Sequence, residues 1–133
     1  MKNVFAICTV MISALTVSST FATEAPKVPA SAKKLTGAEI TLLYDNATIA
    51  FDNFTQKSSM TGTATFDLKK KTSKGTWESG GQSGNFTGAV QVKGDKWCYV
   101  NGNKKQVCDS VYMDGDDIYE VNAKGIVDYK NRK

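Results

Sequence analysis

Residues 35 to 133 contain no proline, and apolar residues alternate with polar ones along much of this stretch. Proline cannot donate to a strand ladder, so its absence suits a continuous hydrogen-bonded sheet. The run from Met60 to Leu68 alternates apolar residues with threonine and aspartate, which predicts a strand with one dry face and one hydroxyl-rich face. Turn signals such as Asn101-Gly102 recur at the spacing of roughly 8 to 12 residues that is typical of meanders, barrels and sandwiches.

Shorter alternating runs extend this pattern over the rest of the chain. Ile49 and Phe51 share one face of a strand expected over residues 47–54, and Phe86 and Val90 share a face of another. Further strands are expected at residues 75–78, 97–100, 105–113, 118–121 and 126–129. We therefore predict a mainly β fold in which one short helix packs on an antiparallel meander of about six to eight strands, barrel-like or layered as a sandwich.

The expected helix begins at Thr36 and Glu39, which have the Thr-x-x-Glu spacing of a capping box. Ile40, Leu43 and Tyr44 follow at the i, i+3, i+4 spacing that places side chains on one helix face. A helix of about two turns is not stable in isolation, so this apolar face must dock on another part of the fold.

The first 22 residues have the three parts of a secretion signal in order. Lys2 supplies the positive charge, residues 4–17 are largely apolar, and Thr20 and Ala22 are the small residues at positions −3 and −1 of a cut. We therefore expect residues 1–22 to be a cleaved signal peptide. The mature protein is then exported, to the periplasm or the extracellular space, with no membrane span left after cleavage.

Residues 23–34 hold both prolines of the chain, and their composition predicts a flexible linker before a single β-rich domain over residues 35–133. The leader contains one of the 17 basic residues, Lys2, and none of the 13 acidic ones. The mature chain therefore carries 16 basic against 13 acidic residues, a net charge of +3. Nucleic-acid partners are not expected, because they usually require a dense basic stripe.

Two cysteines remain after cleavage, Cys98 and Cys108, and an even pair in an exported protein predicts a disulfide. They lie at equal distances on either side of Asn103. A hairpin centred there pairs Cys98 with Cys108 and Tyr99 with Val107. Directly opposed residues of an antiparallel pair lie close enough for such a bridge.

The chain contains no histidine, and this removes a large part of enzyme chemistry. A Ser-His-Asp triad, a Cys-His pair and a histidine-ligated metal or haem are all excluded. Serine–lysine and paired-carboxylate mechanisms stay open. No residue pattern indicates a cofactor, and the absences together favour a non-enzymatic role.

The densest acidic cluster holds Asp114, Asp116, Asp117 and Glu120, whose oxygens are ligands of the kind that calcium prefers. Their order does not match the Asp-x-Asp-x-Asp-Gly calcium loop. We therefore interpret the cluster as a turn with solvated neighbours, and we expect no metal site. An alternative function uses these carboxylates in a hydrolase or a metal-dependent enzyme.

Trp77, Trp97 and Tyr99 are the candidate ligand contacts, because exposed aromatic side chains on a sheet can stack on sugars or bases. Packing in the core or across strands is the more common role of such residues. Alternation places Trp97 and Tyr99 on the face opposite to Cys98. An inward Cys98 would expose them and favour the binding role.

A set of motifs resembles a family of small exported bacterial proteins whose function is not known. These motifs are a Leu-Thr-x-x-Glu-Ile helix start, a Gly-Asp-x-x-Cys turn and strand with a second cysteine, and a Val-Tyr-x-x-Gly-Asp hairpin. One position departs from the family pattern, since Val90 stands where a tryptophan is expected. The resemblance implies export, a disulfide and a compact β fold, and it implies no catalytic residue. The matching residues are Leu35, Thr36, Glu39, Ile40, Gly88, Gly94, Asp95, Cys98, Cys108, Val111, Tyr112, Gly115 and Asp116.

These observations lead first to an exported, non-enzymatic β domain that binds a protein or an envelope polymer. The enzyme built on the acidic cluster is one alternative. A carrier for a small apolar ligand is another, if the strands close into a barrel with a cavity. A sealed interior would favour the first role, carboxylates converging in a cleft the second, and an open apolar cavity the third.

The cleavage site is directly testable. Because the apolar run is short and ends before Thr20-Phe21-Ala22, we expect the exported protein to begin at Thr23. N-terminal sequencing of exported material measures this. A mature start before residue 18 or beyond residue 26 would contradict the prediction.

Overall fold

The computed structural model describes residues 24–56 and 59–133. The predicted signal peptide and its cleavage site lie outside these residues. The fold is mainly β with one short helix, as predicted. Within the described residues, no helix has the length and apolar character needed to cross a membrane. The elements are β1 (Lys33–Lys34), α1 (Gly37–Tyr44), β2 (Thr48–Asn53), β3 (Met60–Asp67), β4 (Thr72–Ser79), β5 (Gln82–Lys93), β6 (Lys96–Val100), β7 (Gln106–Asp114), β8 (Asp117–Val121) and β9 (Val127–Arg132).

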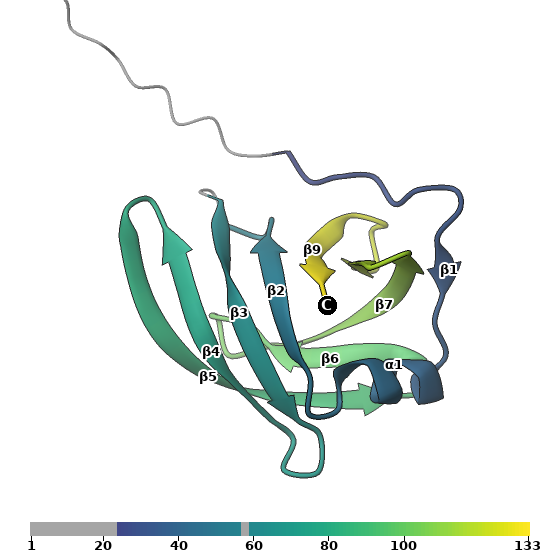
Figure 1. The fold of residues 1–133 in the computed structure, drawn as a ribbon, viewed down its shortest axis with the longest axis horizontal. Helices are drawn as coiled ribbons and strands as arrows, with labels where there is room; N and C mark the ends of the chain where they lie inside the picture. The colour runs from purple at the N-terminus through teal and green to yellow at the C-terminus, as the bar shows by residue number, and fades with distance from the viewer. Residues whose placement is uncertain (1–23, 57–58) are drawn as a thin grey trace, which may run out of the picture.

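The strands β2 to β9 form a closed antiparallel barrel (Figure 1). Each strand pairs with the next one in the chain, and β9 returns to pair with β2, where Asn53 lies opposite Tyr129. Of the two expected architectures, the structure is therefore the barrel and not the sandwich. The additional strand β1 pairs with the end of β7, beyond the part of β7 that pairs with β6.

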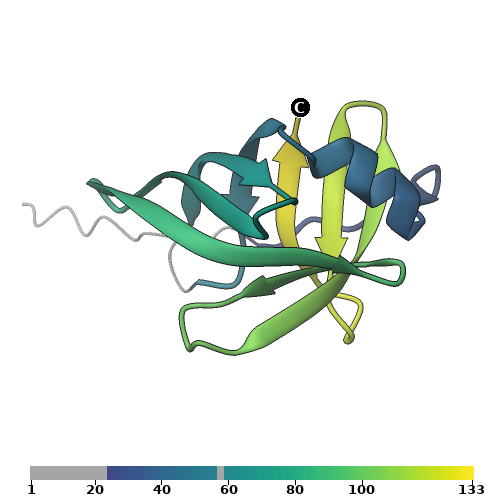
Figure 2. The same ribbon diagram turned by 90° about the horizontal axis from the view of Figure 1, so that it is seen from below.

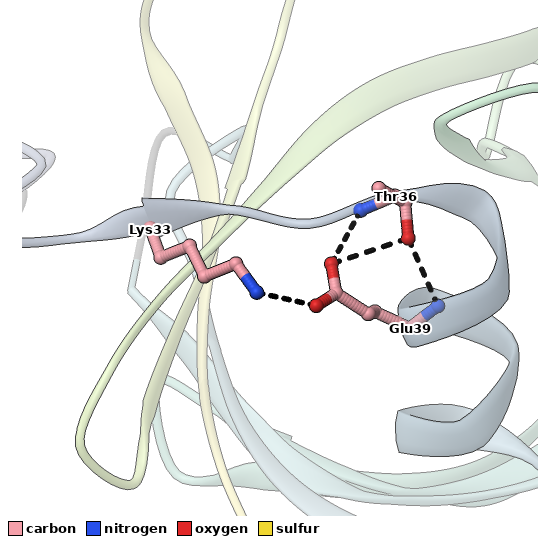
Figure 3. A network of polar contacts seen from close by, with 3 residues as sticks. All are labelled: Lys33, Thr36 and Glu39. Carbon is pink, nitrogen blue, oxygen red and sulfur yellow. Dashed lines mark hydrogen bonds and ion pairs between the residues drawn. The ribbon is translucent and has the colours of Figure 1, made fainter.

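The start of α1 is held by the predicted capping box (Figure 3). The Glu39 amide donates to the Thr36 hydroxyl at 3.3 Å, and the Thr36 amide donates to the Glu39 carboxylate at 2.9 Å. Lys33 forms an ion pair with the same carboxylate, and these hydrogen bonds lower the pKa of Glu39 to about 2. A further bond, from the Gly37 amide to Asp95 at 2.7 Å, ties the helix start to the β5–β6 turn.

The helix closes one end of the barrel (Figure 2). The predicted apolar face, Ile40, Leu43 and Tyr44, is buried. Leu35 precedes the helix and belongs to the same core. The side chains that make up this core are Leu35, Ile40, Leu43, Tyr44, Ile49, Val90, Trp97, Val111 and Ile118. Because neighbouring strands alternate in direction, the β6–β7 and β8–β9 loops lie at the opposite end.

The β6–β7 hairpin has the predicted register. Cys98 lies opposite Cys108, and Tyr99 lies opposite Val107. The two cysteine sulfur atoms lie at disulfide-bonding distance. Because strand residues alternate between faces and Tyr99 lines the cavity, the cysteine pair lies on the face of the hairpin that points away from the cavity, where Cys98 is fully buried. The bridge thus spans the outer wall beside the open end.

The segment before α1 lies against the outside of the barrel. Ala25 and Val28 pack on a small apolar cluster that includes Tyr119, Val121 and Val127. The strand β1 also falls within this segment, which we predicted to be a flexible linker. In the structure, the segment therefore covers the apolar outer side chains of β8 and β9.

The cysteine pair generates a stability prediction. A bridge that closes a loop with a sequence separation of 10 should stabilise the domain by about 2–3 kcal/mol in the chain-entropy model. We therefore expect the Cys98→Ala, Cys108→Ala double variant to melt several degrees lower than the parent protein. Circular dichroism melting curves measure the shift.

Thiol titration of the denatured, unreduced parent protein is the control. No free thiol from this pair is expected. Titration of both thiols would show that the bridge does not form in the protein.

Candidate functional site

A cavity of about 890 Å³ lies inside the barrel and opens at the end opposite α1. Its apolar lining comes mainly from β2 to β6, while its acidic lining comes from β8 and β9. No lysine or arginine is among the lining residues that the structure describes. The principal lining side chains are Ile49, Phe51, Asn53, Met60, Ala64, Phe66, Ser73, Trp77, Phe86, Val90, Trp97, Tyr99, Val107, Glu120, Asn122, Asp128, Tyr129 and Asn131.

The interior stays open because several aromatic rings lie across glycines of the neighbouring strand. Phe51 lies opposite Gly62, and Trp77 lies opposite Gly84. A Cβ atom added to Gly62 would lie 2.7 Å from the Phe51 ring, and one added to Gly84 would lie 2.9 Å from the Trp77 ring. No side chain other than hydrogen fits under these rings. The rings therefore lie along the wall and leave the centre of the barrel free.

Four rings form a chain of edge-to-face contacts around this wall. Phe51 contacts Phe86 and Tyr129, in each case with ring centroids 6.0 Å apart. Tyr129 in turn contacts Tyr99 at 5.4 Å. Edge-to-face packing of this kind is favourable, so the rings support one another as well as the wall. The result is a continuous aromatic belt of Phe86, Phe51, Tyr129 and Tyr99.

The floor of the cavity carries a buried carboxyl group. Glu120 is 4% exposed, and its Oε1 accepts hydrogen bonds from the Tyr44 hydroxyl at 2.7 Å and from the Asn131 amide at 2.6 Å. The Asn131 amide also donates to the Tyr44 hydroxyl at 3.1 Å. The Tyr44 ring stacks on Trp97, with centroids 4.2 Å apart. This polar triad therefore lies where α1 meets the barrel.

Two further carboxyl groups lie on the same side of the barrel. The Tyr99 hydroxyl lies 3.3 Å from Asp109 Oδ2 and 3.4 Å from Asp128 Oδ2. A hydroxyl has one proton to donate, so Tyr99 can serve only one of these oxygens at a time. Asn122 donates to the other Asp128 oxygen at 2.7 Å. Asp109 is 0% exposed, and its Oδ1 has no hydrogen-bond partner.

A β-bulge explains why β9 presents two adjacent residues to the interior. Glu120 pairs with Tyr129 and Val121 pairs with Val127, so Asp128 is the extra residue between them. Both Asp128 and Tyr129 line the cavity, whereas Val127 packs on the outer cluster. Bulges often redirect a side chain next to a functional site.

Burial raises the pKa of each of these carboxyl groups. Desolvation raises the pKa of Glu120 to about 8, and nearby Asp109 and Asp128 add to the effect. Desolvation also raises the pKa of Asp109 to about 7 and raises that of Asp128. The hydrogen bonds from Tyr44 and Asn131 favour the charged form of Glu120 but do not overcome its desolvation.

The three aromatic candidates from the sequence, Trp77, Trp97 and Tyr99, all line the cavity. Cys98 does not point inward, so Trp97 and Tyr99 are not exposed on the outside. Their shared face is the interior of the barrel. Whether they contact a ligand stays a prediction.

The acidic candidates from the sequence do not come together. Glu120 faces the cavity, while Asp117 faces outward and forms ion pairs with Lys130 at 3.1 Å and Arg132 at 3.2 Å. Asp114 is the last residue of β7, and Asp116 lies in the β7–β8 turn. Among the residues that the structure describes, no group of three or more acidic or cysteine side chains is placed to hold a metal ion. An enzyme that combines Asp114 to Glu120 in one site therefore lacks geometric support.

Sequence reasoning missed Asp109, Asp128, Phe51, Phe86 and Tyr129 as site residues. Alternation along β2 and β5 placed Phe51 and Phe86 on one face, but it did not reveal that this face lines a cavity. Tyr129 and Asp128 depend on the bulge, which has no signal in the sequence. The sequence did contain one indication that Asp109 is buried, because it shares a strand face with the apolar residues Val107 and Val111.

The buried carboxyls predict an unusual dependence of stability on pH. A carboxyl whose pKa is higher in the folded chain binds more protons when folded, so raising the pH favours unfolding. The free energy of unfolding should therefore fall from about pH 5 to about pH 8. The upper limit is about 1.4 kcal/mol for each unit by which a pKa is raised. Because the chain has no histidine, no side chain with an ordinary pKa masks this window.

Thermal melting at constant ionic strength measures the effect. The Glu120→Gln variant keeps the shape of the side chain, and it should melt higher than the parent near pH 8 with a weaker pH dependence. The Asp52→Asn variant changes an exposed carboxylate on β2, and it should keep the full pH dependence. A parent melting temperature that is constant or rises between pH 5 and pH 8 would disprove the prediction.

Comparison with known proteins does not assign a function to this cavity. No family model matches the chain, and neither a curated protein nor a solved structure matches it. The resemblance to a family of small exported bacterial proteins stays a prediction.

Proposed function

We propose that this protein is an exported carrier that binds one small, largely apolar ligand inside its barrel. The observation that carries the proposal is the cavity of about 890 Å³, lined by an aromatic belt and open at one end. Barrels of eight strands are just wide enough to hold one small ligand. Ligand pockets in proteins are mostly apolar, measure about 300–1,000 Å³ and carry a few placed polar groups.

The open end supports passage of an apolar molecule. Val100 and Ile126 line the cavity there, and they are 41% and 51% exposed. Exposed apolar side chains at the rim of a cavity are expected where a ligand passes from water into an apolar interior. Asn101 and Asn103 lie at the same rim and supply polar contacts.

The alternative roles have less support. Binding of a protein or an envelope polymer, our first expectation, rested mainly on the absence of catalytic and metal-binding motifs, and it would have gained support from aromatic side chains exposed on the sheet. The aromatic candidates Trp77, Trp97 and Tyr99 line the interior instead. The enzyme alternative rested on carboxylates that the barrel separates, with Asp117 outside and Glu120 inside.

Export is part of the same proposal. The signal-like leader and the cysteine pair at bonding distance both fit an oxidising compartment outside the cytoplasm. In such a compartment a carrier would capture or shuttle its ligand without chemical change. This role needs no nucleophile and no cofactor.

A neutral fluorescent probe tests the carrier function. N-phenyl-1-naphthylamine should bind the parent protein saturably with a stoichiometry of one and gain fluorescence in the apolar cavity. The Ala64→Phe variant places a ring in the lumen, because Ala64 lines the cavity, and it should weaken binding by about tenfold or more. Fluorescence titration gives both affinities.

The matched control is Thr63→Phe, which adds the same ring one residue away on the exposed outer face of β3. It should bind the probe like the parent, and melting curves verify that both variants fold. Absence of saturable binding to the folded parent, or equal loss in both variants, would contradict the carrier function.

A further inference from the structure

We infer that the ligand is an organic cation, an aromatic or aliphatic amine whose ammonium group reaches the carboxyl groups of Glu120 and Asp128 while its apolar body lies against the aromatic belt. This inference rests on the proposed carrier function and names the class of its ligand. It depends on where charge, hydrogen-bond acceptors and aromatic rings lie in the cavity.

Charge is distributed unevenly around the cavity. Glu120 and Asp128 line it, and Asp109 connects to Asp128 through the Tyr99 hydroxyl. No lysine or arginine among the described residues lines the cavity to balance them. The positive charge of Lys96 lowers the pKa of Asp109. Lys96 is nevertheless exposed, and its amine lies 3.4 Å from the Ser110 hydroxyl. A carboxyl group that is buried without a cation is normally held in its neutral form, and a cation bound beside it stabilises the charged form.

The buried polar atoms also lack donors. Asn131 is 4% exposed and lines the cavity, yet its Oδ1 accepts no hydrogen bond. Asp109 Oδ1 has no partner either, but Asp109 is fully buried and is not among the residues that line the cavity. Both unpartnered atoms are acceptors. Since buried acceptors are nearly always satisfied, Asn131 Oδ1 and the nearby carboxyl oxygens of Glu120 and Asp128 are together complementary to a group that donates several hydrogen bonds. An ammonium group offers up to three donors and no acceptor.

The aromatic belt suits the same class of ligand. Tyr99 and Tyr129 line the cavity beside Asp128, and Phe51 and Phe86 continue the belt away from the carboxyl groups. The faces of aromatic rings attract cations, most strongly in desolvated sites. An amine with an apolar body can therefore contact the aromatic belt and pair with the carboxyl groups at the same time. An anion would be repelled by the carboxylates.

Binding of a cation is coupled to proton release. The pKa of Glu120 is raised to about 8, so near pH 7 its carboxyl is mostly protonated in the empty protein. When an ammonium group binds, the carboxyl gives its proton to the solvent and the carboxylate pairs with the cation. Charge balances, because one positive charge enters the cavity and one proton leaves. A neutral ligand produces no such release.

A charge series of one ligand shape tests the inference. The probes are 2-(1-naphthyl)ethylammonium, the neutral 2-(1-naphthyl)ethanol and the anionic 1-naphthylacetate. Calorimetry at pH 7 should show that the ammonium binds about tenfold tighter than the alcohol, or more, and that the anion binds weakest. In buffers of different ionisation enthalpy, the ammonium should release up to about one proton and the alcohol none.

Two variants connect this preference to the carboxyl groups. Glu120→Gln should lower the ratio of ammonium to alcohol affinity by about tenfold and abolish proton release, while Asp128 retains a smaller part of the preference. If Glu120→Gln does not fold, Asp128→Asn, at a half-buried position, should reduce the ammonium preference instead. Asp52→Asn removes the same charge from the outer face and should preserve the preference.

The outcomes separate this inference from the carrier function. Binding of the alcohol as tightly as the ammonium, or an ammonium preference that is undiminished in the folded carboxyl variants, overturns the inference and leaves the carrier function intact. If neither the charge series nor N-phenyl-1-naphthylamine binds, the carrier function fails and the inference fails with it.

Discussion

The contact between Tyr44 and the barrel makes this fold a container with one opening. The Tyr44 ring stacks on Trp97 with centroids 4.2 Å apart, and its hydroxyl donates to Glu120 at 2.7 Å. The helix that carries Tyr44 has only eight residues, so it depends on its capping box and on this docking for its stability. Without the docked helix, a barrel of eight strands would lose the cover over one end. The same contact also sets the floor of the cavity and buries the Glu120 carboxyl.

Above this floor, two different kinds of wall meet. On one side, Phe51 and Trp77 lie across glycines. Glycine has no side chain to project into the barrel, so the space beside these rings stays open. On the other side, Glu120 and Asp128 bring acidic groups inward, helped by the bulge in β9. An apolar wall facing an acidic wall is complementary to an amphipathic molecule. Under the proposed carrier function, the division between the two walls would orient the ligand.

The buried carboxyl groups lower the stability of the fold as the pH rises. Burial of Glu120 and Asp109 favours their protonated forms, and deprotonation near neutral pH works against folding. Proteins commonly keep such destabilising groups where function requires them. Other features offset the cost, among them barrel closure, the cysteine pair in the outer wall, and the packing of Val28 on the outer cluster.

The sequence by itself determined the local parts of this protein. The capping box at Thr36, the apolar helix face, the strand alternation and the pairing of Cys98 with Cys108 each depend on a few neighbouring residues, and each is found in the structure. Alternation also separates the two faces of a strand. It cannot identify which face is inside a barrel, because a sandwich shows the same period of two.

Tertiary structure alone decided the closure and the chemistry of the interior. The pairing of β2 with β9 joins residues such as Asn53 and Tyr129, which are far apart in the chain, so no local pattern specifies it. Closure turned the faces of Trp77 and Tyr99 into a cavity lining, and the bulge added Asp128. The raised pKa of Glu120 likewise follows from burial, which is a property of the assembled barrel and not of the residue.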